Sequence, residues 1–342
     1  MKSPGAEPFE TQPEPSIKVL HVQEALIFLH LMKTGGTSLF RLLKPHYPRQ
    51  HTFHYGSKPG RTLHDFEQLP PDNRDQLKFI HGHLAFGFHH RLNQPCRYIT
   101  MLRDPISRVI SLYYFLYHNP QRYIPEHQRC ETLHDFLELN YLDADNYQTR
   151  QIAGPLSEQF GFGKCNTTLL NVAKANLAEC LSVGITERFD ESLLVLRHQL
   201  GLNQILYAPF NQNQSKPKRE TIDNQDLERI RACNQFDIEL YQFANELLDQ
   251  SVNTLGDSFK AEYHLFQFAN DQYRSTTSEV ASVKKKIRKT RKTIKRVRQR
   301  RQQFKQKKES IQEKISSLSQ SRFLQLVQRF SRFWNTTAKF KK

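Results

Sequence analysis

The sequence predicts an α/β fold of three layers around a central parallel β-sheet, followed by a basic helical extension that resembles a coiled coil. An apolar run at 26–29 leads into the turn Met32–Ser38 (MKTGGTS) and then into leucines at helical spacing. Two later apolar runs, at 79–80 and 97–102, end in polar residues, as buried strands of an α/β sheet do. Residues 284–342 contain 22 Lys and Arg but two acidic residues.

The net charge of +16 is unevenly distributed along the 342 residues. Outside 284–342 the chain has 28 basic and 32 acidic residues, so the body is close to neutral and the tail is strongly cationic. We therefore expect two physically different parts, and a proline-rich start that buries little. The predicted organisation is a disordered leader at 1–18, a globular domain at 19–250, a helical connector at 251–283 and a basic helical tail at 284–342.

The glycine turn after the first strand is a candidate anion-binding loop. A strand, a glycine turn and a helix together point backbone N–H groups and a helix N-terminus at a ligand. Gly35 and Gly36 allow close backbone approach, Lys33 adds a positive charge, and Thr37 and Ser38 add hydroxyl donors. The lysine precedes the glycines, unlike in the Walker motif. The alternative is an ordinary strand-to-helix turn with Thr37 as N-cap.

Two histidines follow the second predicted strand, which ends near Ile80. His81 and His83 lie where open α/β sheets place their ligand sites. They are separated by one residue, so an extended backbone would direct them to opposite sides and at most one would face the site. A hydrogen-bonded structural role is the simpler interpretation of either histidine. The chain offers no further metal ligands at suitable spacing, and we expect no metal site.

The third predicted strand, at 97–102, leads into Arg103-Asp104-Pro105. Asp104 suits a helix N-cap and Pro105 the first helical position. Arg103 would lie at the strand tip, where it can contact a phosphate or simply pair with an acidic neighbour. Ser111 would lie about two turns into the helix.

The other elements are less informative. The segment 46–61 reads as a long loop, and the polar residues at 145–150 are more typical of a solvated helix face than of a substrate contact. We expect helices at 63–69, 133–142, 165–180 and 187–201, a helix or helix pair at 221–249, and a late strand at 183–186.

The five cysteines are scattered and form no CxxC pair. We expect reduced thiols and a cytoplasmic location. The N-terminus lacks the apolar core of a signal peptide, and no segment reaches the roughly 18 apolar residues of a membrane span.

Three motifs in this order resemble those of the PAPS-dependent sulfotransferases: KTGGTS, His-Gly-His and R-D-P-x-S-R-x-x-S. The sequence is similar to the branch that includes the heparan sulfate 2-O- and 6-O-sulfotransferases and their bacterial relatives, and VGITERFDESLL at 183–194 also resembles that branch. The resemblance covers about Val19–Asp249 and none of the tail. It implies a fold like that of the P-loop NTPases, with PAPS as co-substrate and no metal.

The resemblance also implies roles for individual residues. His83 would be the catalytic base, with His81 as the alternative, and Lys33 would stabilise the departing nucleotide. Arg103 and Ser111 would bind the 3′-phosphate of PAPS. The 5′-phosphosulfate loop would comprise Lys33, Thr34, Gly35, Gly36, Thr37 and Ser38, and a covering loop would contribute Ser215 and Lys216.

The expected reaction is transfer of the sulfuryl group to a hydroxyl, on a carbohydrate if the resemblance to this branch holds. Lipids and small alcohols stay open as acceptors, because no acceptor pocket can be read from the sequence. The alternative is a non-catalytic protein that binds a polyanion or a membrane through a nucleotide-binding scaffold.

The tail repeats in sevens from Val280 to Gln325, and nine of the fourteen core positions are apolar. A basic helix with an imperfect coiled-coil seam could self-associate, bind an anionic polymer or lie on an anionic membrane. All three interpretations stay open at this point.

Overall fold

The computed structural model describes residues 24–56, 62–117, 130–208 and 222–337. The chain divides into two compact units, Met1–Arg274 and Ser275–Lys342. The predicted leader and the expected cofactor residues Ser215 and Lys216 lie outside the described residues.

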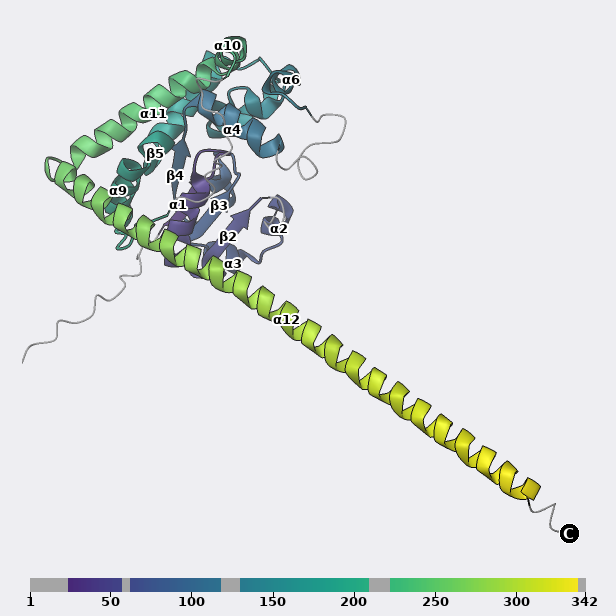
Figure 1. Cartoon of the computed structure of the whole chain (residues 1–342). Helices are drawn as coiled ribbons and strands as arrows, with labels where there is room; N and C mark the ends of the chain where they lie inside the picture. Colours follow the sequence, from purple (N-terminus) through teal and green to yellow (C-terminus); the bar gives the residue numbers. More distant parts are fainter. Residues whose placement is uncertain (1–23, 57–61, 118–129, 209–221, 338–342) are drawn as a thin grey trace, which may run out of the picture. The chain divides into compact units, whose positions relative to one another are not determined.

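The first unit is built on five parallel strands in the order β2-β3-β1-β4-β5 (Figure 1). In the middle of the sheet, Leu29 of β1 lies opposite Gly82 of β3 and Thr100 of β4. Parallel strands bring their carboxyl ends to one edge of the sheet. The strands are β1 (Ala25–Leu29), β2 (Thr52–Tyr55), β3 (Phe79–Gly82), β4 (Cys96–Leu102) and β5 (Ser182–Ile185).

Both faces of the sheet are buried, because alternate residues of β1 enter different hydrophobic clusters. Leu26 and Phe28 pack in the cluster that includes α1 (Gly36–Leu43) and α9 (Phe189–Leu200). Ile27 and Leu29 pack in a second cluster with α2 (Leu63–Glu67). The predicted α/β fold with a central parallel sheet is therefore confirmed.

The remaining helices surround this sheet and its polar edge (Figure 1). They are α3 (Pro71–Asp75), α4 (Pro105–Tyr117), α6 (Leu133–Glu138), α7 (Tyr147–Ala153), α8 (Thr167–Ala178), α10 (Asn224–Cys233) and α11 (Gln235–Thr254). At the start of α4, Asp104 accepts a hydrogen bond from the Ser107 N–H (2.8 Å), as predicted.

The segment 46–61 contains a strand, so the prediction of a long loop was wrong there. Strand β2 pairs with β3 and buries Phe53, with Thr52 and His54 on its other side. Four residues with one buried phenylalanine give too short a pattern to detect. The pairing with β3 defines this strand.

The polar residues after Leu142 are buried, which contradicts the expected solvated helix face. Arg150 donates to Asp145 (2.5 Å) and to the carbonyl oxygens of Phe160 and Gly161. The carboxylate of Asp237, on α11, accepts the backbone N–H groups of Gln148 (3.1 Å) and Thr149 (2.7 Å). These side chains cap and join helices inside the protein, and the charged groups of Asp145, Arg150 and Asp237 have hydrogen-bond partners there.

Helix α12 (Ser258–Thr337) begins inside the first unit and continues through the second. Phe259 and Phe266 are buried in the main cluster, so the expected connector contributes to the core of the globular unit. From Ser275 onward the helix forms the second unit, which confirms the helical tail, whereas its coiled-coil association stays a prediction. No helix among the described residues is long and apolar enough to cross a membrane.

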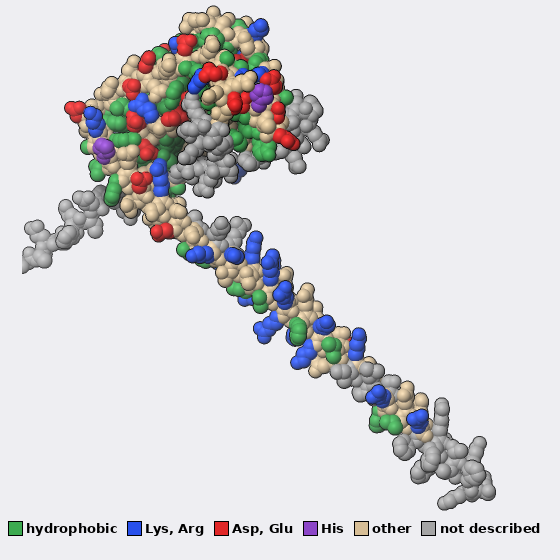
Figure 2. Space-filling view, turned by 45° about the horizontal axis from the view of Figure 1, so that its top comes forward, with side chains coloured by type: hydrophobic (Ala, Val, Ile, Leu, Met, Phe, Trp, Pro, Cys, Tyr) green, Lys and Arg blue, Asp and Glu red, His purple; other side chains and the backbone are tan. Residues whose placement is uncertain are grey.

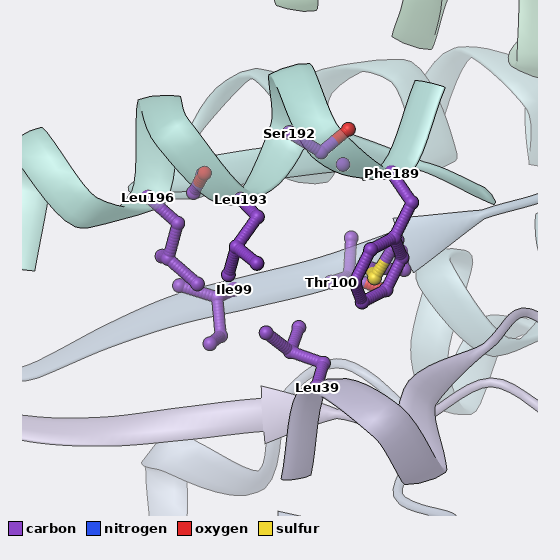
Figure 3. A pocket seen from close by; sticks show the side chains of 10 residues that line it. Leu39, Ile99, Thr100, Phe189, Ser192, Leu193 and Leu196 are labelled. Carbon is purple, nitrogen blue, oxygen red and sulfur yellow. The ribbon is translucent and has the colours of Figure 1, made fainter. Parts of the chain in front are cut away.

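A small pocket between β4, β5, α1 and α9 is lined mainly by apolar side chains (Figure 3). Leu39, Ile99, Leu193 and Leu196 point into it. It is a gap in the core packing and lies apart from the polar residues at the sheet edge.

Replacing Asp237 by Ala should lower the free energy of unfolding by about 3 kcal/mol, because two buried N–H groups lose their acceptor. Asp249→Ala is the matched control on the same helix; its partly exposed ion pair with Arg188 predicts a loss below about 1 kcal/mol. Urea unfolding monitored by circular dichroism would measure both. Equal losses would contradict the capping role.

Candidate active site

The candidate site lies at the carboxyl ends of β1, β3 and β4, the three central strands of the sheet. The loop from β1 to α1 follows the middle strand. His81 and His83 come from the end of β3 on one side, and Arg103 comes from the end of β4 on the other. The topology thus brings together the three motifs that are separate in the sequence.

The loop between β1 and α1 turns through two residues with left-handed backbone angles. Lys33 has φ 69° and Gly35 has φ 79°. Helix α1 begins at Gly36 with Gly35 as its N-cap, and no side chain caps it. The interpretation with Thr37 as N-cap was therefore wrong, and the first N–H groups of α1 have no side-chain acceptor at the cap.

The second glycine is required by close packing. A Cβ on Gly36 would lie 2.1 Å from Cδ2 of His30, so any larger residue would displace that ring or the loop. Thr34 is fully buried and donates from Oγ1 to the Leu31 carbonyl (2.9 Å). Its own carbonyl accepts from Thr186 Oγ1 (2.7 Å). The loop is thus held from both sides.

Lys33 carries its amine over an aromatic ring. The Lys33 Nζ lies 4.1 Å from the centroid of the Phe115 ring on α4. Burial, together with the nearby positive charge of Arg103, lowers the pKa of Lys33 to about 8. The amine therefore stays mostly charged at pH 7, although it loses its proton more easily than a free lysine, and a bound anion would favour the charged form further.

Arg103 is joined directly to the loop. Its Nη1 donates to the Lys33 carbonyl oxygen (3.0 Å), and its Nε lies 3.7 Å from Oε1 of Glu187. The buried Nε has no hydrogen-bond partner among the described residues. Arg103 therefore contacts both an acidic neighbour and the glycine loop, and it retains a donor for a ligand.

The backbone of Arg103 is fixed by the buried side chain of Gln148. The Gln148 amide accepts from the Arg103 N–H (2.9 Å) and donates to the Arg103 carbonyl (2.9 Å). Ser111 lies on α4 as expected and is almost completely buried. Its predicted contact with a ligand stays a prediction.

His81 is enclosed by other aromatic rings. It stacks on Phe40 at 3.9 Å between ring centroids, and its Nε2 lies 3.1 Å from Nδ1 of His54. Burial, reinforced by the other positive groups nearby, lowers the pKa of His81 to about 3. This neutral ring is packed against α1 and has little access to a substrate.

His83 is exposed, and its ring is oriented by the main chain. Its Nδ1 lies 2.7 Å from the His30 carbonyl oxygen, which can only accept a hydrogen bond. The Nδ1 therefore carries the proton and the neutral ring keeps a lone pair on Nε2. Partial loss of water around the ring lowers the pKa of His83, although the bond to His30 opposes this shift.

The glycine between the two histidines allows this arrangement. Gly82 has φ 149°, and a Cβ there would lie 1.8 Å from the Tyr55 carbonyl oxygen on β2. The backbone must pass close to the edge strand before it turns His83 outward. Gly82 thus separates a buried histidine from an exposed one.

Sequence reasoning missed three residues that shape the site. His30 orients His83 and packs on Gly36, Phe115 supports Lys33, and Gln148 holds Arg103. Only Gln148 had a signal, since its polar segment was noted as a possible contact. No group of three or more His, Cys, Asp or Glu side chains in the described part of the chain could hold a metal ion.

Comparisons with known proteins find sulfotransferases among the proteins that this chain resembles. A zebrafish heparan-sulfate 6-O-sulfotransferase 2 is 26% identical over 310 residues, which cover 73% of this chain and 60% of the relative. The human heparan-sulfate 6-O-sulfotransferase 1 is 25% identical over 273 residues, which cover 66% of each chain. The chain thus spans about two thirds or less of the length of these relatives.

The solved structures that match include that of a mouse sulfotransferase in complex with PAP. Its TM-score is 0.33 at 12% identity, and the match covers 64% of this chain and 66% of that chain. These values are too low to support an argument about the fold or the site.

The galactose-3-O-sulfotransferase family model matches residues 23–329. This match extends beyond Asp249, where we expected the resemblance to end, into the long helix. It covers most of the chain, and the expected sulfotransferase relationship is confirmed: the protein belongs to the galactose-3-O-sulfotransferase family.

Proposed function

We propose that this protein transfers the sulfuryl group of PAPS to a hydroxyl of a glycan, by in-line displacement with His83 as the base. The orientation of His83 carries this proposal. Its Nδ1–H bond to the His30 carbonyl leaves Nε2 free to accept a proton, at the sheet edge where Lys33 and Arg103 are held together.

The loop and Arg103 suit the two phosphate groups of such a nucleotide. The turn through Gly35 and Gly36 brings the backbone N–H groups and the first turn of α1 close to where an anion would bind. The buried Nε of Arg103 lies near Glu187 but has no hydrogen-bond partner among the described residues, and it would supply a charged donor for the 3′-phosphate. Ser111 is the proposed second contact, and Ser215 and Lys216 are proposed to cover the nucleotide.

PAPS supplies the sulfuryl group and leaves as the 3′,5′-diphosphate nucleotide. His83 Nε2 takes the acceptor hydroxyl proton as the new oxygen–sulfur bond forms. Lys33 stabilises the negative charge that develops on the leaving phosphate. Positioning and charge stabilisation supply most of the catalysis in this type of transfer.

The relatives support a glycan acceptor, since those reported above are named heparan-sulfate 6-O-sulfotransferases. The location in the cell stays a prediction.

The proposed nucleotide site should prefer PAP, which carries the 3′-phosphate, over AMP, which lacks it. At a hundredfold excess over its Kd, PAP should raise the Tm by about 5 °C, and AMP should raise it much less. Arg103→Ala should abolish this preference. Arg97→Ala, which removes an exposed arginine of the same strand β4, is the matched control and should retain it. Equal shifts with PAP and AMP for the unsubstituted protein would refute the site.

Replacing His83 by Gln should lower kcat for sulfate transfer by about 100- to 10,000-fold, because the base is lost. PAP binding and Tm should stay near those of the unsubstituted protein. His81→Gln is the neighbouring control and should mainly lower Tm, because this ring is packed in the interior. A His83→Gln enzyme with normal turnover would place the base elsewhere.

The pH profile should report the same base. Partial loss of water around its ring shifts the pKa of His83 below the usual value of 6.5, so the ring stays neutral to lower pH than a fully solvated histidine. The kcat/KM should therefore be constant near pH 7 and fall as pH decreases through the shifted pKa. An acid limb that persists in His83→Gln would exclude His83 as its origin.

Lys33→Ala should lower kcat more than it weakens PAP binding, because the charge on the leaving phosphate develops in the transition state. Lys44→Ala, an exposed lysine just after α1, is the control. Transfer of labelled sulfate and isothermal titration with PAP would separate the two effects. A loss confined to binding would contradict the role proposed for Lys33.

A further inference from the structure

The second unit contains a segment whose charge is unusually dense. Ten of the 18 residues at 291–308 are Lys or Arg, and none is acidic. All of them are helical and exposed in the structure. At about 1.5 Å per residue the segment is about 27 Å long. Figure 2 shows blue Lys and Arg side chains along this helix with isolated green apolar ones between them.

The charges surround the helix. With about 100° between successive residues, the ten basic positions leave no sector wider than about 80° without a charge. A flat membrane or a straight partner helix would contact only one side. A flexible linear polyanion could contact several sides of the helix and displace counterions from all of them.

The apolar seam is too interrupted here to favour those other partners. Within 291–308 the seam positions Ile294, Val297 and Phe304 are apolar, and each has about half or more of its surface exposed. Arg301 and Lys308 occupy the other two positions of the seam. Charged seam residues oppose both a coiled-coil core and insertion into lipid.

The positions that flank the seam also oppose pairing with a second copy. Arg291, Arg298 and Lys305 lie on one flank, and Arg300 and Lys307 lie on the other. In a paired helix these flanks face each other across the seam, so like charges would repel. A partner with negative charge is therefore favoured.

We propose that residues 291–308 bind a linear sulfated polysaccharide. The choice of this polymer rests on the proposed glycan acceptor, whereas the need for an anionic partner follows from the charges alone. The segment would hold a polymer that is an acceptor or a product of the proposed reaction, and would raise its concentration near the enzyme.

Binding of a fluorescent heparin fragment to the full chain tests this proposal without PAPS. The combined substitution Arg298→Gln, Arg300→Gln and Arg301→Gln removes three charges and keeps good helix formers. It should raise the Kd for heparin at least tenfold. The matched control removes three exposed charges of the first unit, Arg49→Gln, Lys164→Gln and Lys260→Gln, and should change the Kd less than twofold.

Two further results would overturn the inference. One is an equal effect of both triple variants; the other is tighter binding to vesicles of phosphatidylcholine and phosphatidylglycerol than to heparin at equal concentration of charge. Raising NaCl from about 50 to about 200 mM should weaken heparin binding at least tenfold. If the tail binds heparin but the protein transfers sulfate to no acceptor, only the proposed function is refuted. If the protein transfers sulfate but the tail substitutions leave the Kd for heparin unchanged, only this inference is refuted.

Discussion

The hydrogen bond from Arg103 to the carbonyl of Lys33 is the contact on which the rest of the site depends. It joins the end of β4 to the glycine loop after β1, two segments that are 70 residues apart. The Thr186 hydroxyl reinforces the junction, because it lies within hydrogen-bond distance of the carbonyl oxygens of Thr34 and Leu102 and can donate to either. Buried main-chain acceptors need such partners, so the loop is positioned before any ligand arrives.

Different burial gives His81 and His83 different environments, although both side chains are imidazoles. His81 and His83 differ by two positions, yet one is packed among rings and the other projects from the sheet edge with a defined tautomer. The same burial lowers the pKa of Lys33 and brings its amine onto the Phe115 ring. Perturbed groups gathered at one sheet edge are typical of functional sites, and here they coincide with the motifs that first suggested the family.

The first unit holds side chains in fixed positions, whereas the basic helix presents positive charge along its length. The first unit supplies fixed geometry at the sheet edge, where polar side chains such as Gln148 are themselves buried and bonded. The described side chains of the helix beyond Ser275 are almost all exposed and offer positive charge along its length. A catalytic centre needs the former, whereas capture of a flexible anionic chain needs only the latter.

The sequence by itself determined the strands at 26–29, 79–80 and 97–102, the glycine loop and the charge of the tail. Runs of apolar residues, neighbouring glycines and runs of charged residues are local properties that can be read without the fold. The sequence could not reveal β2, the buried role of Gln148 or the choice between His81 and His83. Those features depend on pairing and packing between distant segments. Strand β2 forms by pairing with β3, and Gln148 is buried where its side chain bonds the backbone of Arg103. His83 turns outward after Gly82, which passes close to the Tyr55 carbonyl. Only the tertiary structure shows that His81 is packed among aromatic rings, whereas His83 is exposed and has its Nδ1 bonded to the His30 carbonyl.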